Sequence, residues 1–102
     1  MNQAQLMQQM KKMQAEMVKA QEELASTTVQ GSAANGIVTV EMTGDQRMKS
    51  ISISKEAVDP DDIETLEDLV TVAVNDALTK SNEAAHKRMG GVTGGMRIPG
   101  LM

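Results

Sequence analysis

The chain of 102 residues contains no cysteine and no Phe, Trp or Tyr, and it has two prolines and one histidine. The lack of cysteine excludes disulfides, thiolate nucleophiles and cysteine-based metal sites. The lack of aromatic residues excludes a surface on which the bases of a single strand could stack. Ten methionines supply part of the apolar volume, although Met specifies a packed core less sharply than branched side chains do. A chain of this size has room for one domain, and stability shared across a subunit interface would suit it.

Long apolar runs are also absent. Nothing in the sequence approaches the roughly 18 consecutive apolar residues that a membrane-spanning helix requires. The N-terminus does not show a basic segment followed by an apolar run, so we predict no signal peptide. We therefore expect a protein of the cytoplasm that has no membrane partner.

The charge of the chain is divided unevenly. Its net charge of −4 at pH 7 argues against a simple polycationic nucleic-acid binder. Residues 55–68 hold one lysine and seven acidic residues, whereas residues 79–102 hold four basic residues and one acidic residue. The acid is therefore concentrated in one segment while the far end of the chain is basic, and such asymmetry matters more for the choice of partner than the total does.

Residues 2–25 are predicted to form the first long helix. This segment has no Gly or Pro and is rich in Gln, Met, Lys, Glu and Ala, which favour helices. Its apolar residues follow alternating steps of four and three, the spacing of a helix that packs along another helix. They are Leu6, Met10, Met13, Met17, Ala20 and Leu24.

Three short strands are predicted next, joined as an antiparallel meander. Residues 26–30 are β-prone and lead into a turn signal at residues 31–36, and residues 37–43 and 47–53 alternate between apolar and polar side chains. Gly44 is expected at the first central position of a tight hairpin turn. One face of the sheet carries the apolar side chains of Val38, Val40, Met42, Ile51 and Ile53. Such a small sheet cannot stand alone, so another element must cover it.

A second long helix is predicted to follow, with Asp59 as its N-cap and Pro60 at its first helical position. Gly90 and Gly91 are expected to end it. Its apolar stripe comprises Ile63, Leu66, Leu69, Val70, Ala73, Val74, Ala77, Leu78 and Ala84. At about 1.5 Å per residue the rod would be roughly 43 Å long, more than strands of about 20 Å can cover. Parts of both helices must therefore project or meet another subunit.

No catalytic arrangement is recognisable. His86 stands alone within the second helix, without a nucleophile and an orienting acid at a familiar spacing. The acidic residues around Pro60 are explained by the helix start, and the glycines do not form a phosphate-binding loop. We therefore expect no enzyme, no cofactor and no small-molecule substrate. The remaining candidates for function are basic residues on or beside the helices: Lys11, Lys12, Lys19, Lys80, Lys87 and Arg88.

The residues alone leave two interpretations open. These basic side chains could contact nucleic acid, or they could be ordinary solvated charges on a helical adaptor or chaperone-like module. In the second case the Met-rich first helix would grip another protein, because Met surfaces adapt to varied partners.

Several segments, taken in order, resemble the YbaB/EbfC family of nucleoid-associated proteins. The similarity spans nearly the whole chain, and the order and spacing of its segments make it specific. The similar segments are residues 8–14, 22–24, 29–31 with Gly36, 38–40, 66–70, 73–77 with Lys80 and Glu83, 94–95 and 98–100.

The resemblance implies an α+β subunit of order α-β-β-β-α and a tweezer-like homodimer joined through its sheets and neighbouring helix surfaces. It also implies a single domain over residues 1–91, followed by a flexible Gly-rich tail at 92–102. The partner would be double-stranded DNA in the nucleoid, with a role in nucleoid organisation and possible effects on gene regulation. Carried over by position, the DNA contacts would be made by the same six residues, Lys11, Lys12, Lys19, Lys80, Lys87 and Arg88.

Overall fold

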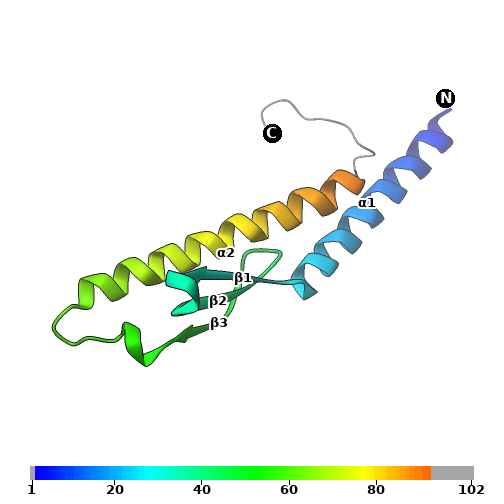
Figure 1. The fold of residues 1–102 in the computed structure, drawn as a ribbon. Helices are drawn as coiled ribbons and strands as arrows, with labels where there is room; N and C mark the ends of the chain where they lie inside the picture. The colour runs from blue at the N-terminus through cyan, green and yellow to red at the C-terminus, as the bar shows by residue number, and fades with distance from the viewer. Residues whose placement is uncertain (1, 93–102) are drawn as a thin grey trace.

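The computed structural model describes residues 2–92, with side chains as far as Gly90. Two long helices flank a three-stranded sheet, which confirms the predicted α-β-β-β-α order (Figure 1). The predicted tail lies outside the described residues except for Val92, the last residue of the second helix. The elements are α1 (Gln3–Ser26), β1 (Thr28–Ala33), η1 (Ala34–Gly36), β2 (Val38–Thr43), β3 (Met48–Ile53), η2 (Lys55–Ala57) and α2 (Ile63–Val92).

Helix α1 agrees with its prediction to within one residue at each end. Its first turn is capped by Asn2, whose side chain accepts a hydrogen bond from the backbone N–H of Gln5 at 2.8 Å. Only Ala20 and Leu24 of the apolar stripe are buried, and both lie in the C-terminal part of the helix. The N-terminal part projects away from the sheet (Figure 1). We call this projecting N-terminal part of α1 the arm. Its stripe residues Met10, Met13 and Met17 are exposed.

The sheet has the predicted antiparallel order β1-β2-β3. Its strongest packing is on one face, where Val38, Val40 and Met42 of β2 are at most 2% exposed. Helix α2 covers this face through Ala73 and Ala77, which are completely buried. The small side chains of α2 allow its backbone to approach the sheet closely.

The predicted turn at residues 31–36 is wrong in its first half, because β1 continues through Gly31 to Ala33. A Cβ atom on Gly31 would lie 2.3 Å from the backbone nitrogen of Ala77 and 2.4 Å from the carbonyl oxygen of Ala73. Gly31 therefore marks the point where the helix backbone touches the strand, and not a turn. The turn itself is confined to η1.

The hairpin between β2 and β3 also differs from its prediction. The residue with positive φ is Gln46, at 68°, and not Gly44. The carbonyl of Thr43 accepts a hydrogen bond from the N–H of Gln46 at 3.0 Å, and the N–H of Thr43 donates to the carbonyl of Arg47 at 2.7 Å. The loop is thus one residue longer than a two-residue hairpin turn. Gly44 is needed for packing, because a Cβ there would lie 2.9 Å from the carbonyl oxygen of Leu24.

Strand β3 is left uncovered by α2. Ile51 and Ile53 pair with Val40 and Val38 and so share their face of the sheet. They are nevertheless 42% and 40% exposed, since α2 lies over β1 and β2. The alternation predicted from the sequence is correct, but only the β2 part of this apolar face is buried within one subunit.

The start of α2 is three residues later than predicted. Asp62, not Asp59, caps the helix, and its carboxylate accepts hydrogen bonds from the N–H and the hydroxyl of Thr65 at 3.3 and 2.6 Å. Asp59 accepts from the N–H of Asp61 at 2.9 Å, which places Pro60 in a turn before the helix. At the other end α2 continues through Gly90 and Gly91 to Val92, so the glycines do not end it.

Candidate nucleic-acid interface

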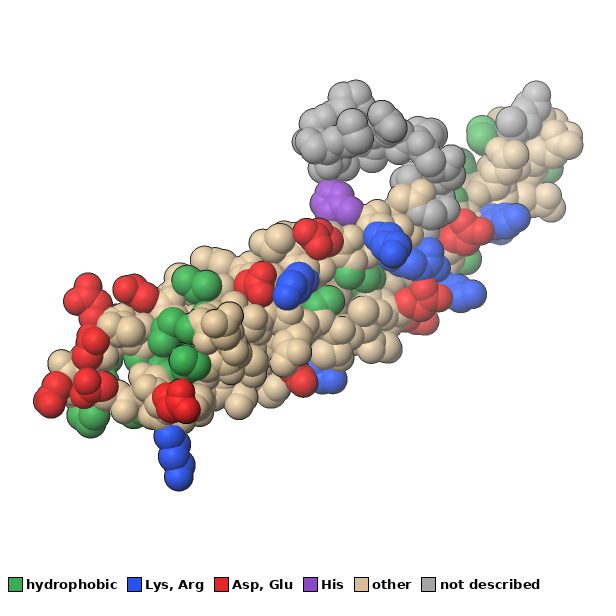
Figure 2. Space-filling model, viewed as in Figure 1, with side chains coloured by type: hydrophobic (Ala, Val, Ile, Leu, Met, Phe, Trp, Pro, Cys, Tyr) green, Lys and Arg blue, Asp and Glu red, His purple; other side chains and the backbone are tan. Residues whose placement is uncertain are grey.

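The end of α2 and the C-terminal part of α1 pack together and bring most of the predicted basic residues to one end of the molecule. Figure 2 shows most Lys and Arg side chains where α2 ends and α1 projects, interspersed with acidic ones, and a denser group of acidic side chains at the start of α2. We call the basic residues of the first region, Lys11, Lys12, Lys19, Arg47, Lys80, Lys87 and Arg88, the basic end. The same stretches of α1 and α2 also carry Glu16, Glu22, Glu23, Asp76 and Glu83. The acidic end comprises Glu56, Asp59, Asp61, Asp62, Glu64, Glu67 and Asp68.

Contacts among three elements hold the basic end in shape. The N–H of Gly44 donates to the carbonyl of Leu24 at 2.9 Å, which fixes the β2–β3 hairpin against the end of α1. The hydroxyl of Ser81, which is completely buried, donates to the carbonyl of Thr43 at 2.9 Å and ties α2 to the same hairpin. The N-terminal part of α1 therefore projects from a well-packed junction between α1, α2 and the β2–β3 hairpin.

Four of the six predicted lysine and arginine residues form no hydrogen bond or salt bridge among the described residues. Lys11, Lys12 and Lys19 on α1 and Lys87 on α2 are exposed, and the described part of the chain offers them no hydrogen-bond or ion-pair partner. Exposed, unpaired ammonium groups are the form in which lysine binds phosphate oxygens.

Lys80 is engaged in a different way. Its Nζ donates to the carbonyl of Gln30 at 3.0 Å and forms an ion pair with Asp76 at 3.3 Å. Asp76 in turn accepts a hydrogen bond from the N–H of Ser32 at 3.0 Å. This hydrogen bond and the one from Lys80 hold the pKa of the Asp76 carboxyl below its usual range. Lys80 and Asp76 together fasten β1 to α2, so part of the charge of Lys80 serves the fold.

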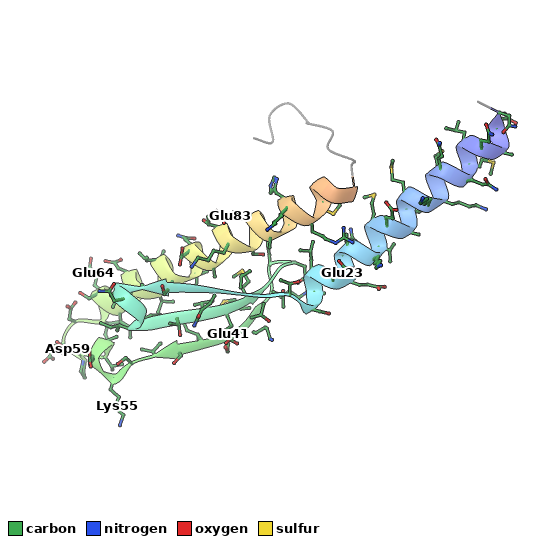
Figure 3. The ribbon with its side chains drawn as sticks, turned by 45° about the vertical axis from the view of Figure 1, so that its right-hand side comes forward. Glu23, Glu41, Lys55, Asp59, Glu64 and Glu83 are labelled. Carbon is green, nitrogen blue, oxygen red and sulfur yellow. The ribbon has the colours of Figure 1, made fainter. Side chains whose placement is uncertain are left out.

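Arg88 links the two helices. Its Nε donates to a carboxylate oxygen of Glu23 on α1, and Figure 3 shows Glu23 at the junction between α1 and the body. The hydrogen bond lowers the pKa of the Glu23 carboxyl and raises the pKa of the Arg88 guanidinium. Of the six predicted residues, Lys80 and Arg88 are thus engaged in ion pairs, whereas Lys11, Lys12, Lys19 and Lys87 form none within residues 2–92.

Arg47 is a seventh basic residue at this end that the sequence did not single out. It closes the hairpin that contacts Leu24, next to Gln46, whose side chain donates to that of Asn82 on α2. The sequence prediction made Arg47 the first residue of the strand 47–53, whereas β3 begins at Met48. Its nearness to α1 and α2 depends on tertiary contacts that join residues far apart in the chain.

The described residues provide no metal-binding or membrane-spanning feature beside the basic end. That part of the chain contains no group of three or more His, Cys, Asp or Glu side chains placed to hold a metal ion. At the acidic end, Asp59 and Asp62 are occupied by hydrogen bonds to the turn and to the start of α2. No helix within residues 2–92 combines the length and the apolar character needed to cross a membrane.

Comparison with known proteins gives this arrangement a context. A model of the YbaB/EbfC DNA-binding family matches residues 1–96. The chain belongs to this family. It is 53% identical over 97 residues to a nucleoid-associated protein of Chloroflexus aurantiacus, covering 95% of this chain and 97% of that one. It is 51% identical over 101 residues to a nucleoid-associated protein of Roseiflexus sp., covering 99% and 100%.

A solved structure shares the fold of this chain. The crystal structure of an uncharacterized protein from Helicobacter pylori matches with a TM-score of 0.71, covering 91% of this chain and 94% of that chain, at 19% sequence identity. At this level of identity the likeness concerns the fold alone. The family is described as DNA-binding, which agrees with the exposed lysines that form no ion pair among the described residues.

Proposed function

We propose that this YbaB/EbfC family member binds double-stranded DNA as a homodimer through its basic end and contributes to organising the nucleoid in the cytoplasm. The observation that carries the proposal is the group of four exposed lysines on two helices, Lys11, Lys12, Lys19 and Lys87, that form no ion pair within residues 2–92. Seven acidic residues lie away from it, at the start of α2, whereas Glu16, Glu22, Glu23 and Glu83 lie on the two helices near the lysines (Figure 3).

Binding of this kind would consist mainly of phosphate contacts. Lysine ammonium groups neutralise phosphates and release counterions, which gives attraction that weakens steeply as salt rises. The described basic residues form no set that dictates a base sequence, so we expect little discrimination between sequences. Effects on gene regulation would then follow from where and how densely the protein covers DNA.

Dimer formation is supported by apolar surface that one subunit leaves open. Met48, Ile51 and Ile53 of β3 are 40–49% exposed along a strand whose outer edge pairs with no other strand in residues 2–92. An uncovered apolar row beside a free sheet edge is a surface that another chain can cover. A second copy there would double the number of basic residues available to one duplex.

The proposal is tested by gel shifts on a duplex at about 50 and 200 mM salt, together with sedimentation to measure the oligomeric state. We expect a dimer whose binding falls steeply between the two salt concentrations. Replacing Lys11, Lys12, Lys19 and Lys87 by Glu should abolish detectable binding at the lower salt. Unchanged affinity in that variant would remove these residues from the interface, and absence of binding by the wild type would overturn the proposal.

A protein-interaction role is the second candidate, favoured by the methionines of the arm. Met7, Met10, Met13 and Met17 are 40–62% exposed, and Met side chains adapt to partners of varied shape. A stoichiometric protein complex that is lost when Met10 and Met13 become Gln, combined with no DNA binding at low salt, would favour this role over the first.

A further inference from the structure

Glu23 forms an ion pair with Arg88, the one arginine of the described helices, and this pair bears on DNA binding. We propose that Glu23 sets the DNA affinity of the basic end by competing with phosphate for Arg88. The inference rests on the proposed DNA-binding function and names a residue that limits it.

The pair is placed where a DNA phosphate can reach it. Arg88 comes from α2 and Glu23 from α1, and their side chains remain 32% and 45% exposed. Lys19, one turn before Glu23 on α1, attracts the same carboxylate, and Glu16 adds a second negative charge near Arg88. The pair therefore sits on the surface, among residues of the basic end.

The chemistry of the two possible partners of Arg88 is alike. A guanidinium group binds carboxylate and phosphate oxygens with the same planar set of donors. Glu23 takes the Nε donor, while no hydrogen bond within the described residues occupies the two terminal nitrogens. A phosphate can approach those nitrogens, but it meets the negative charge of Glu23 beside them. Its binding must either displace Glu23 or overcome that repulsion.

The pair of Lys80 and Asp76 does not offer the same adjustment. Asp76 also accepts the backbone N–H of Ser32, and Lys80 also donates to the carbonyl of Gln30, so both residues are fixed to β1. Glu23 has no backbone donor among the described hydrogen bonds, and its link to Arg88 is the only one recorded for its side chain there. Removing the charge of Glu23 should therefore change binding without loosening the sheet.

The test compares Glu23→Gln with Glu22→Gln in the full chain. Both variants remove one negative charge from the same turn of α1, but Glu22 has no side-chain partner among the described residues. The amide of Glu23→Gln can still accept from Arg88, which preserves the contact between the helices. Binding to a duplex is measured over a range of salt concentrations, with thermal unfolding as a check that each variant is folded.

We expect Glu23→Gln to bind about two- to fivefold more tightly than Glu22→Gln for each contacting subunit. The slope of log affinity against log salt should steepen by about 0.9 for each added phosphate contact. In an Arg88→Gln background the difference between the two variants should vanish, because Glu23 acts through Arg88.

Several results would overturn the inference. If the wild type binds DNA but Glu23→Gln and Glu22→Gln bind equally, Glu23 does not limit affinity and the proposed function stands without it. Weaker binding by Glu23→Gln would mean that the ion pair holds the arm in its binding position. A difference that persists in the Arg88→Gln background would show that Glu23 does not act through Arg88. If even the wild type fails to bind at low salt, the inference and the proposed function both fall.

Discussion

The two helices carry apolar residues at similar spacings, yet they are covered to very different degrees. On α2, Ala73 and Ala77 are completely buried against the sheet, whereas Met10 and Met13 on α1 are 62% and 54% exposed. Spacing thus identifies a helix that can pack, but it does not identify what covers the helix. The size of the side chains separates the two: alanines let a helix backbone lie close to a strand, whereas flexible methionines stand on an open arm.

The stability of the fold should be most sensitive to substitution at Gly31, where β1 lies against the backbone of α2. Gly31→Ala would push a Cβ into the backbone of α2, with atoms at 2.3 and 2.4 Å. Because backbone cannot move aside as a flexible side chain can, we expect a loss of about 3–5 kcal/mol in the free energy of unfolding. Denaturant unfolding measures it.

The matched control for this substitution is Gly90→Ala near the end of α2, where an added Cβ meets no atom within 4 Å. Alanine favours a helix over glycine, so this variant should be unchanged or more stable by up to about 1 kcal/mol. Equal losses in the two variants would show that close approach at Gly31 is not what restricts that position.

Replacing a methionine by alanine should lower the free energy of unfolding far more in the sheet core than in the projecting part of α1. Met42 is 2% exposed, and Met42→Ala should cost about 2–4 kcal/mol through lost burial and the cavity left behind. Met13 is 54% exposed, and Met13→Ala should change the free energy of unfolding by less than about 0.5 kcal/mol. Comparable losses would mean that the stripe of α1 is buried in the working assembly, and dependence of the Met13 effect on protein concentration would identify a second copy as the cover.

Acid should weaken the fastening of β1 to α2. The pKa of Asp76 lies below its ordinary value of 3.8 because Ser32 and Lys80 donate to its carboxylate. A depressed pKa stabilises the fold above the unfolded value and loses that contribution as the pH falls through the folded value. Asp76→Asn should therefore unfold at a lower temperature than the wild type at pH 7, and the difference should shrink on acidification from about pH 4 downward. A difference that stays constant from neutral to acid pH would contradict this account.

Much of the fold follows from local pattern. The limits of α1, the number and order of the three strands and the buried face of β2 are predicted correctly, because periodicity and helix propensity act over a few neighbouring residues. The errors concern residues whose local meaning is ambiguous. Gly31 and Gly44 were predicted as turn residues, but each is a glycine because another backbone lies against it. Asp59 is of a residue type that commonly caps helices, but Asp62 provides the N-cap of α2.

The candidate site was predictable in its charges but not in their pairing. The lysines of α1 and Lys87 could be named as basic residues on predicted helices, and Lys87 also lies in the basic segment 79–102. The pair of Arg88 and Glu23 joins residues 65 apart in the sequence, and Arg47 reaches the basic end through a hairpin. Both depend on how α1, α2 and the hairpin meet, which no short segment specifies.

The central claim is that the basic end, and not the molecule as a whole, attracts DNA. Its most direct test is the salt dependence of duplex binding for Lys87→Glu beside Lys55→Glu, since both reverse one exposed lysine and Lys55 lies at the acidic end (Figure 3). We expect Lys87→Glu to lower affinity about tenfold and to reduce the salt slope by about 1, while Lys55→Glu leaves both close to the wild type. Equal losses in the two variants, or a larger loss for Lys55→Glu, would contradict it.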